Sequence, residues 1–173
     1  YIHYLAAQGI VEGVGDGAFA PERAVTRAEF VKMLAGMAGA ELGEFEGRSD
    51  FADVAPDSWY AGSVAWARDT GVTQGVSDTV FRPNDPITRE QMAAMIRRFA
   101  EQMAMELPLV REAIAFSDED QFSDWAREPV AFLQRAGLLD GVGDGRFDPA
   151  GAVTREQAAK VLALLHQAVY AGA

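Results

Sequence analysis

Apolar residues recur at the spacing of an amphipathic helix in three separate segments of the chain. Within each segment they occupy positions i, i+3, i+4 and i+7, which lie on one face of an α-helix. These positions are Phe30, Met33, Leu34 and Met37, then Met92, Met95, Ile96 and Phe99, and then Ala158, Val161, Leu162 and Leu165. Three equivalent apolar faces can be buried against one another. The pattern therefore predicts an all-α protein with a central three-helix bundle and pseudo-threefold symmetry.

The three helical segments belong to a longer internal repeat. Residues 25–29 read VTRAE, residues 87–91 read ITREQ and residues 153–157 read VTREQ. Seven identities keep the same order in every copy, and the copies are 62 and then 66 residues apart. In the first copy these identities are Gly9, Gly13, Asp16, Phe19, Pro21, Thr26 and Arg27. A period of this length indicates one supersecondary unit per repeat.

A shorter helix is predicted ahead of each loop, over residues 1–8, 59–70 and 125–136. Each of these segments ends at a glycine, which accepts the left-handed conformation that closes a helix. Each repeat thus consists of helix, loop and helix, with a loop phenylalanine as a buried anchor (Phe19, Phe81 and Phe147). The connector at residues 106–115 is expected to add a short helical turn.

The repeats divide the chain into three modules, residues 1–40, 41–105 and 106–173, which we expect to form one compact domain. The second module carries Asp53 and Trp59 ahead of its first helix, and the third carries Asp118 and Trp125. The first module has no counterpart of this front half. Since the chain also begins without Met, we expect it to be a fragment or a processed product.

Threonine occupies the expected N-cap of each second helix, at Thr26, Thr88 and Thr154. Three positions later stand Glu29, Gln91 and Gln157. This is the spacing of a capping box, in which each side chain bonds the other residue's backbone N–H. Losing such a cap costs roughly 0.5–2 kcal/mol. We interpret the threonines as structural.

Arginine follows each threonine, at Arg27, Arg89 and Arg155, where capping does not require it. The helix dipole opposes a cation at this position by roughly 0.3–1 kcal/mol. One interpretation is an ion pair between modules. The other is a guanidinium fork that binds a carboxylate or phosphate beside free helix N–H groups. Threefold recurrence at a disfavoured position indicates a use other than capping, and both interpretations stay open on the residues alone.

The front-half residues also allow two interpretations each. Trp59 and Trp125 are either core residues or flat platforms for a sugar face, with the indole N–H free to bond. Asp53 and Asp118 either cap the first helix or its preceding turn, or accept hydrogen bonds from sugar hydroxyls. Trp66 is expected to pack in the core.

Composition removes several classes of function. Fifteen basic and 26 acidic residues give a formal charge of −11, which argues against a nucleic-acid binder. The absence of cysteine excludes a disulfide framework and thiolate metal sites. No apolar run approaches the roughly 18–20 residues that span a bilayer. His3 and His166 are isolated, and no nucleophile stands beside a base, so we predict no catalytic residue, metal or cofactor. An enzyme domain elsewhere in a parent protein would leave no trace in this segment.

The ordered pattern F-x-D, W, G, G-x-x-D-x-x-F-x-P and [IV]-T-R-[AE]-[EQ] resembles the S-layer homology (SLH) domain over nearly the whole chain. The resemblance implies a three-module anchor of exported proteins at the bacterial cell surface, in the cell wall or S-layer. It also implies non-covalent binding of an anionic, often pyruvylated, secondary cell wall polymer in grooves between modules. Carried over by motif, the ligand-binding residues are Arg27, Arg89, Arg155, Asp53, Asp118, Trp59 and Trp125.

If each groove draws on neighbouring modules, Arg27 is expected to share a site with Asp53 and Trp59. The alternative function is a protein-interaction or self-assembly module of a surface layer, whose acidic surface meets basic partners or divalent cations. Cell-wall polysaccharide or S-layer subunits are thus the expected partners. Nucleic acid and membrane insertion are not expected.

Overall fold

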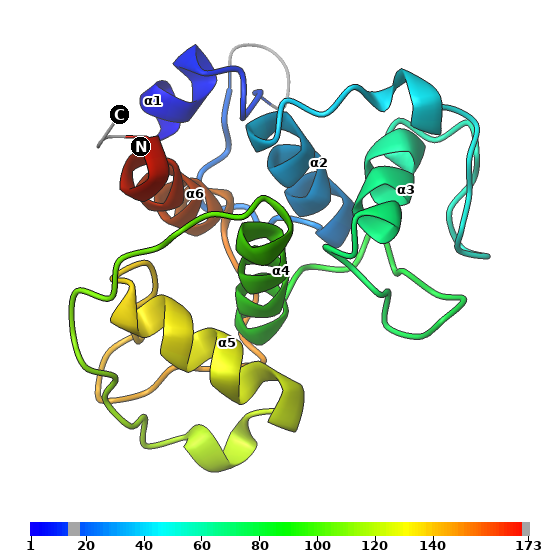
Figure 1. The fold of residues 1–173 in the computed structure, drawn as a ribbon. Helices are drawn as coiled ribbons and strands as arrows, with labels where there is room; N and C mark the ends of the chain where they lie inside the picture. Colours follow the sequence, from blue (N-terminus) through cyan, green and yellow to red (C-terminus); the bar gives the residue numbers. More distant parts are fainter. Residues whose placement is uncertain (14–17, 171–173) are drawn as a thin grey trace.

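The computed structural model describes residues 1–13 and 18–170 of the chain (Figure 1). Its elements are α1 (Ile2–Ala7), α2 (Arg27–Met37), the 3₁₀ helix η1 (Leu42–Phe45), α3 (Ala61–Asp69), α4 (Arg89–Gln102), the 3₁₀ helix η2 (Glu119–Gln121), α5 (Asp124–Arg135) and α6 (Arg155–Tyr170). In the described part of the chain, extended backbone pairing is limited to isolated bridges. The predicted all-α class is confirmed. Asp16, one of the repeated loop residues, lies outside the described residues.

The helical turn predicted for residues 106–115 is wrong. The backbone N–H groups of Val110 and Arg111 both donate to the carbonyl of Arg135, at 2.9 and 3.2 Å. The N–H of Ile114 donates to the side-chain oxygen of Gln134 at 3.0 Å. The connector therefore runs along the end of α5 and uses its donors there instead of in a turn of its own.

The three segments that precede α2, α4 and α6 bond to one another in a closed cycle. Val25 N–H donates to the carbonyl of Val153, Val153 donates to Ile87, and Ile87 donates to Val25, at 2.9, 3.0 and 3.0 Å. All three side chains are fully buried. Because each segment uses both partners, the starts of the three long helices are fixed relative to each other.

Helix packing follows a cyclic order as well. The second helix of each module packs against the first helix of the next, so that α2 lies on α3, α4 on α5 and α6 on α1 (Figure 1). The apolar faces predicted from the sequence are buried, with Phe30, Leu34, Met92, Ile96, Phe99 and Leu162 among the fully covered side chains. Part of each face is therefore covered by a neighbouring first helix.

The loop phenylalanines differ between modules. Phe81 and Phe147 are fully buried, as predicted, whereas Phe19 is only half-buried. Phe51 stacks on Phe81 with ring centroids 5.5 Å apart, and Phe116 lies 5.3 Å from Phe147. These covering rings come from the front halves of the second and third modules. Among residues 1–13 and 18–170 no aromatic ring stacks on Phe19 in this way, so Phe19 lacks the equivalent cover.

Candidate functional site

The threonines cap α2, α4 and α6 as the sequence predicts. The N–H of Glu29, Gln91 and Gln157 each donates to a threonine hydroxyl at 3.2 Å. The carboxylate or amide oxygen of the same three residues accepts the N–H of Thr26, Thr88 and Thr154 at 2.9, 3.2 and 3.0 Å. All three capping boxes are complete.

The helix starts offer no free N–H groups beside the arginines, contrary to expectation. The N–H of Arg27 donates to the carbonyl of Asp85 at 3.0 Å, and that of Ala28 to Pro83 at 3.0 Å. The equivalent amides of α4 and α6 bond in the same way to residues 149 and 151 and to residues 21 and 23. With the third N–H held by threonine, the first three donors of each helix are already used.

Each of the three arginines inserts into the loop of the following module. Their exposed fractions are 3% for Arg27, 7% for Arg89 and 3% for Arg155. The Nε atoms donate to the backbone carbonyls of Phe81, Phe147 and Phe19, at 2.8, 2.6 and 2.9 Å. Each guanidinium also lies over the ring of that phenylalanine, 4.5–4.8 Å from its centroid. The contact joins modules through a backbone oxygen and a ring face.

The second arm of the fork is used in two of the three arginines. Nη2 of Arg89 donates to the carbonyl of Asp140 and Nη2 of Arg155 to that of Glu12, both at 2.7 Å. The buried Nη2 of Arg27 has no acceptor among the described residues. The repeat aligns Gln74 with Glu12 and Asp140, but Arg68 Nη1 already donates to the Gln74 carbonyl at 2.8 Å.

Ion pairing explains little of the arginine geometry. Among the described residues, only Arg155 of the three has a carboxylate within 4 Å, with Nη1 3.7 Å from Glu29. Burial lowers the pKa of Arg27 from its ordinary value to about 10. Burial also lowers the pKa of Arg89 and of Arg155 from the ordinary value. At pKa values of this order the guanidinium of Arg27 keeps its charge near neutral pH.

Asp53 and Asp118 hold the loops that receive the arginines. The carboxylate of Asp53 accepts the N–H groups of Phe81 and Arg82, at 2.8 and 2.7 Å. Asp118 accepts those of Phe147 and Asp148, at 2.9 and 2.8 Å. Neither carboxylate caps a first helix. Desolvation opposes the ionisation of Asp118, but the two N–H donors and the charge of Arg146 outweigh it and lower its pKa.

The two front-half tryptophans are exposed, which excludes the core interpretation. Trp59 is 60% exposed and Trp125 is 49% exposed, whereas Trp66 is buried against Phe99 as expected. Trp59 lies just before α3 and Trp125 lies in the first turn of α5. Each indole therefore stands at the surface near the start of a first helix.

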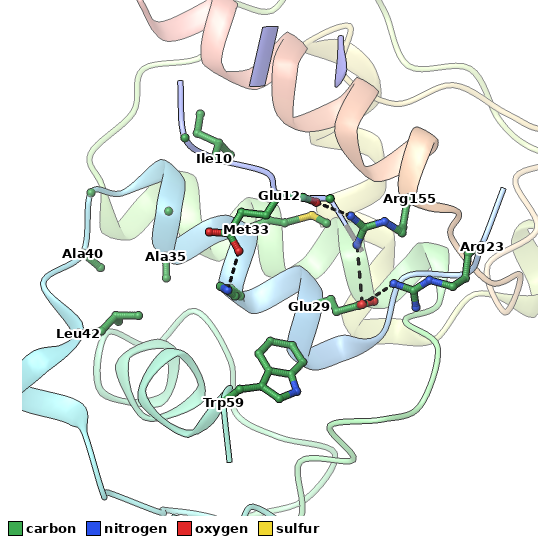
Figure 2. Close-up of a pocket in the computed structure, with 15 residues that line it drawn as sticks. Ile10, Glu12, Arg23, Glu29, Met33, Ala35, Ala40, Leu42, Trp59 and Arg155 are labelled. Carbon is green, nitrogen blue, oxygen red and sulfur yellow. Dashed lines mark hydrogen bonds and ion pairs between the residues drawn. The ribbon is translucent and has the colours of Figure 1, made fainter. Parts of the chain in front are cut away.

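Two cavities bring tryptophan and arginine together. Groove 1 has a volume of about 500 Å³ and is lined by Trp59, Arg155, Glu29, Lys32, Glu12 and Arg23, among others (Figure 2). Groove 2 has a volume of about 340 Å³ and is lined by Trp125, Arg27, Gln91, Arg98, Met95 and Gly75, among others. Each groove takes its arginine, its helix face and its tryptophan from three different modules.

The two grooves are the same place in successive repeats. The repeat offset takes residues of groove 1 to residues of groove 2: Glu12, Gly13, Glu29, Lys32 and Met33 become Gln74, Gly75, Gln91, Ala94 and Met95. The tryptophans and arginines correspond too. Arg27 thus shares a cavity with Trp125, and not with Asp53 and Trp59 as the sequence suggested. Arg89, Asp53 and Asp118 line neither of these two cavities.

Sequence reasoning missed the polar residues on the helix faces that line the grooves. Lys32 stands three positions after Glu29, and Arg98 stands seven positions after Gln91. These spacings put both residues on the same helix face as the capping side chain. The signal was available, because a capping residue and the residues three, four and seven positions later lie on one face.

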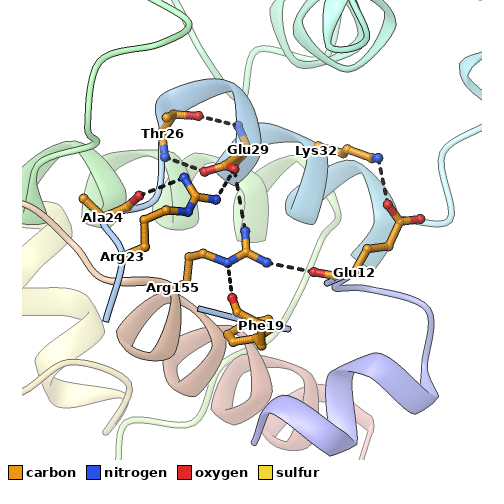
Figure 3. A network of polar contacts seen from close by, with 8 residues as sticks. All are labelled: Glu12, Phe19, Arg23, Ala24, Thr26, Glu29, Lys32 and Arg155. Carbon is orange, nitrogen blue, oxygen red and sulfur yellow. Dashed lines mark hydrogen bonds and ion pairs between the residues drawn. The ribbon is translucent and has the colours of Figure 1, made fainter. Parts of the chain in front are cut away.

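Glu29 also belongs to a network of charges at the edge of groove 1 (Figure 3). Its Oε1 pairs with Arg23 Nη2 at 2.5 Å and with Arg155 Nη1 at 3.7 Å, while Oε2 accepts the Thr26 N–H. Partial desolvation disfavours the charged carboxylate. Hydrogen bonds from Arg23 and Thr26, together with the charges of Arg23 and Arg155, nevertheless hold the pKa of Glu29 below its ordinary value.

Residues 1–13 and 18–170 contain no group of three or more His, Asp or Glu side chains placed to hold a metal ion. Within the same residues, no helix combines the length and the apolarity needed to cross a membrane.

Comparison with known proteins gives matches along most of the chain. The family model described as the S-layer homology domain matches residues 1–31, 50–93 and 115–159. The chain is 36% identical over 161 residues to an amylopullulanase of Thermoanaerobacterium thermosulfurigenes, which covers 93% of the chain and 8% of that protein. It is 29% identical to the surface-layer 125 kDa protein of Lysinibacillus sphaericus, covering 92% of the chain and 13% of that protein. It is also 29% identical to the S-layer protein sap of Bacillus anthracis, and the match covers 94% of the chain and 19% of that protein. The chain thus spans less than a fifth of each of these relatives.

Proposed function

Since the chain belongs to the S-layer homology family, we propose that its grooves bind an anionic secondary cell wall polymer and so hold a parent protein on the cell wall. The family and its surface-protein relatives make the chain an extracellular module that anchors proteins at the bacterial cell surface. The proposal adds the ligand and the place where it binds. A pyruvylated sugar is the ligand that we put forward, because its single carboxylate suits a guanidinium fork.

The observation that carries the proposal is the pairing of an exposed tryptophan with a buried arginine in two equivalent cavities. An indole that is 49% or 60% exposed, as in Trp125 and Trp59, offers an apolar face to a sugar ring and a free N–H to its hydroxyls. Positive charge lies beside each indole. It comes from Arg155 and Lys32 in groove 1, and from Arg27 and Arg98 in groove 2. A repeated cavity of this kind suits a polymer with repeated units, because each groove binds one unit and the grooves reinforce each other.

Within this proposal the candidate site residues have different roles. Trp59, Trp125, Arg27 and Arg155 are proposed to contact ligand. Arg89 is proposed to serve a third junction of the same kind. Asp53 and Asp118 are proposed to act on ligand binding indirectly, because their carboxylates hold the loops that receive Arg27 and Arg89.

We also propose that the modules, residues 1–40, 41–105 and 106–173, are related by a pseudo-threefold axis along which α2, α4 and α6 form a central bundle. The closed hydrogen-bond cycle of Val25, Ile87 and Val153 supports this arrangement. The cyclic order of the arginine–phenylalanine contacts supports it as well.

Self-association within a surface layer is the second candidate function. It is favoured by relatives that are themselves named surface-layer proteins. We propose no catalytic role for this chain, since the enzyme among these relatives matches it over only 8% of its length.

The test is retention on purified bacterial cell walls, before and after the non-peptidoglycan polymer has been removed. Replacing Trp59 and Trp125 together by Ala is expected to weaken retention roughly tenfold or more, because two exposed ring faces are lost. Val110→Ala is the matched control, since Val110 is 64% exposed and lines neither groove. A folded double variant that binds walls as well as the control would contradict the proposal. Light scattering without walls tests self-association directly.

A further inference from the structure

We propose that the two grooves differ in the charge they accept: groove 2 binds the anionic substituent of the ligand, and groove 1 is closed to an anion by Glu29. The inference rests on the proposed function, because it assigns the charged group to one of the proposed sites. The anionic substituent is a carboxylate or a phosphate, since either fits a guanidinium.

Groove 1 already contains a carboxylate at the place where a ligand anion would bind. Glu29 pairs with both Arg23 and Arg155, and its side chain is only 18% exposed (Figure 3). Its second oxygen is held by the helix cap. A ligand carboxylate at Arg155 would therefore have to lie close to the ionised carboxylate of Glu29, which is held 3.7 Å from the same guanidinium. Like charges in close proximity repel each other.

The tryptophan of groove 1 is also partly engaged. Lys32 Nζ lies 5.6 Å from the centroid of the Trp59 ring and pairs with Glu12 at 3.0 Å. This ion pair is exposed, with side-chain exposures of 46% and 75%, so it contributes little and a ligand can displace it. The partly buried Glu29 network, and not the Glu12 pair, is therefore what distinguishes groove 1.

Groove 2 has the same architecture without the carboxylates. Gln91 replaces Glu29, and Gln74 stands at the position of Glu12. Lining residues Arg27 and Arg98 carry positive charge, and the lining contains no Asp or Glu. Asp53 and Asp85 act electrostatically on Arg27 from outside the groove, yet among the described residues neither carboxylate forms an ion pair with its guanidinium.

Both cations of groove 2 have unused donors. Arg27 is 97% buried and its Nη2 has no acceptor among the described residues, although a buried guanidinium N–H normally has one. Arg98 makes no hydrogen bond or ion pair with the rest of residues 1–13 and 18–170, and it is only half-buried. A bound oxyanion supplies acceptors to Arg98 beside the open face of Trp125, while Arg27 adds positive charge from the groove lining.

The three indole N–H signals of Trp59, Trp66 and Trp125 in a ¹H–¹⁵N spectrum report on the grooves separately, with buried Trp66 as the internal reference. The probes are a methyl hexoside carrying a 4,6-pyruvate ketal, the same hexoside carrying a neutral 4,6-isopropylidene ketal, and a methyl hexoside 6-phosphate. In the wild-type chain we expect Trp125 to shift with the pyruvate ketal or the phosphate at concentrations roughly tenfold or more below the neutral ketal. Trp59 is expected to show no such preference. The anion that shifts the Trp125 signal at the lower concentration identifies the natural substituent as carboxylate or phosphate.

Two substitutions test the assignment to residues. Arg98→Gln is expected to weaken the anion response of Trp125 by roughly tenfold, whereas Arg97→Gln, whose guanidinium pairs with Glu101 and Glu128 outside the groove, is expected to leave it unchanged. Glu29→Gln is expected to give Trp59 an anion response, because it makes groove 1 resemble groove 2. Capping is preserved in this variant, since glutamine caps α4 and α6. Glu106→Gln, an exposed change of the same charge outside the grooves, is the control.

Equal anion responses of Trp59 and Trp125 in the wild-type chain would overturn the inference. So would a Glu29→Gln variant whose Trp59 signal still ignores the anions. If the wild-type chain is retained on cell walls while either result is found, the inference fails and the proposed function stands. If neither indole signal responds to any probe and the wild-type chain is not retained on cell walls, the proposed function itself fails.

Discussion

Two modules are joined at each of Arg27, Arg89 and Arg155, and the group that accepts the Nε hydrogen bond in the following module is an uncharged carbonyl. Each guanidinium takes a backbone carbonyl and a phenylalanine ring from the following module, and the loop that supplies them is fixed by an aspartate in two of the three cases. A buried guanidinium without acceptors would be costly, so the loop must be held in place for the arginine to be buried at all. Asp118 is therefore expected to matter for stability.

Asp118→Asn is predicted to lower the free energy of unfolding at pH 7 by about 1–3 kcal/mol, because the amide N–H₂ would face a backbone donor. Since the folded state lowers the pKa of Asp118, its ionised form stabilises the fold above the unfolded-state pKa near 4, and the contribution is lost as the pH falls through the folded-state pKa. Urea unfolding at several pH values measures this. The difference between variant and wild type should shrink below about pH 4. A difference that does not depend on pH would rule out the carboxylate as the cause.

Much of this residue chemistry could not be predicted from the sequence. The caps could, because a threonine and a Glu or Gln three positions later contact each other within one turn. The acceptors of the arginines are backbone carbonyls about 50 to 140 positions away in the chain, and a carbonyl leaves no trace in side-chain identity. The sequence also left open whether Trp59 and Trp125 are buried or exposed, since their exposure depends on the neighbouring module.

At the level of helices, α2, α4 and α6 begin at sharply defined positions. Each start combines a capping box with two N–H groups that bond to a neighbouring loop. The cap and the loop contacts thus stabilise the same few residues. The short first helices have no such device in the structure: α1 and α3 show no side-chain cap. Their ends depend on packing against α6 and α2, which sequence periodicity does not reveal.

Thr88→Ala is predicted to destabilise the fold by about 0.5–2 kcal/mol, since the N–H of Gln91 loses its acceptor at a helix end that is half-buried. Thr88→Ser keeps the hydroxyl and should recover most of this loss. Chemical denaturation of both variants compares them directly. Equal losses in the two variants would point to the methyl group and not to the cap.

The whole molecule is a set of three modules that complete one another. Every module receives an arginine from its predecessor in the cycle, donates one to its successor, and covers the second helix of its predecessor with its own first helix. The sequence made the all-α class, the helices and the repeat predictable, because these follow from local periodicity. It did not reveal that each second helix packs against the first helix of the next module, because apolar faces pair equally well within a module.

Cooperative unfolding of the whole chain is the consequence that we predict at this scale. Tryptophan fluorescence, which reports the second and third modules, and far-ultraviolet circular dichroism, which reports all helices, should give the same transition midpoint. The calorimetric and van't Hoff enthalpies should agree. Separate transitions would show that the modules fold independently, and the stabilities of single variants would then apply to one module each.

The closed cycle of Val25, Ile87 and Val153 also bears on how such a chain can evolve. Open repeat proteins such as solenoids lengthen by adding units at either end, because each unit contacts only its neighbours along the stack. Here the third segment bonds back to the first, so a fourth unit would find no free donor or acceptor in the cycle. Duplication of one module is therefore expected to produce an unpaired copy, and gain of binding capacity would proceed through duplication of the complete triplet.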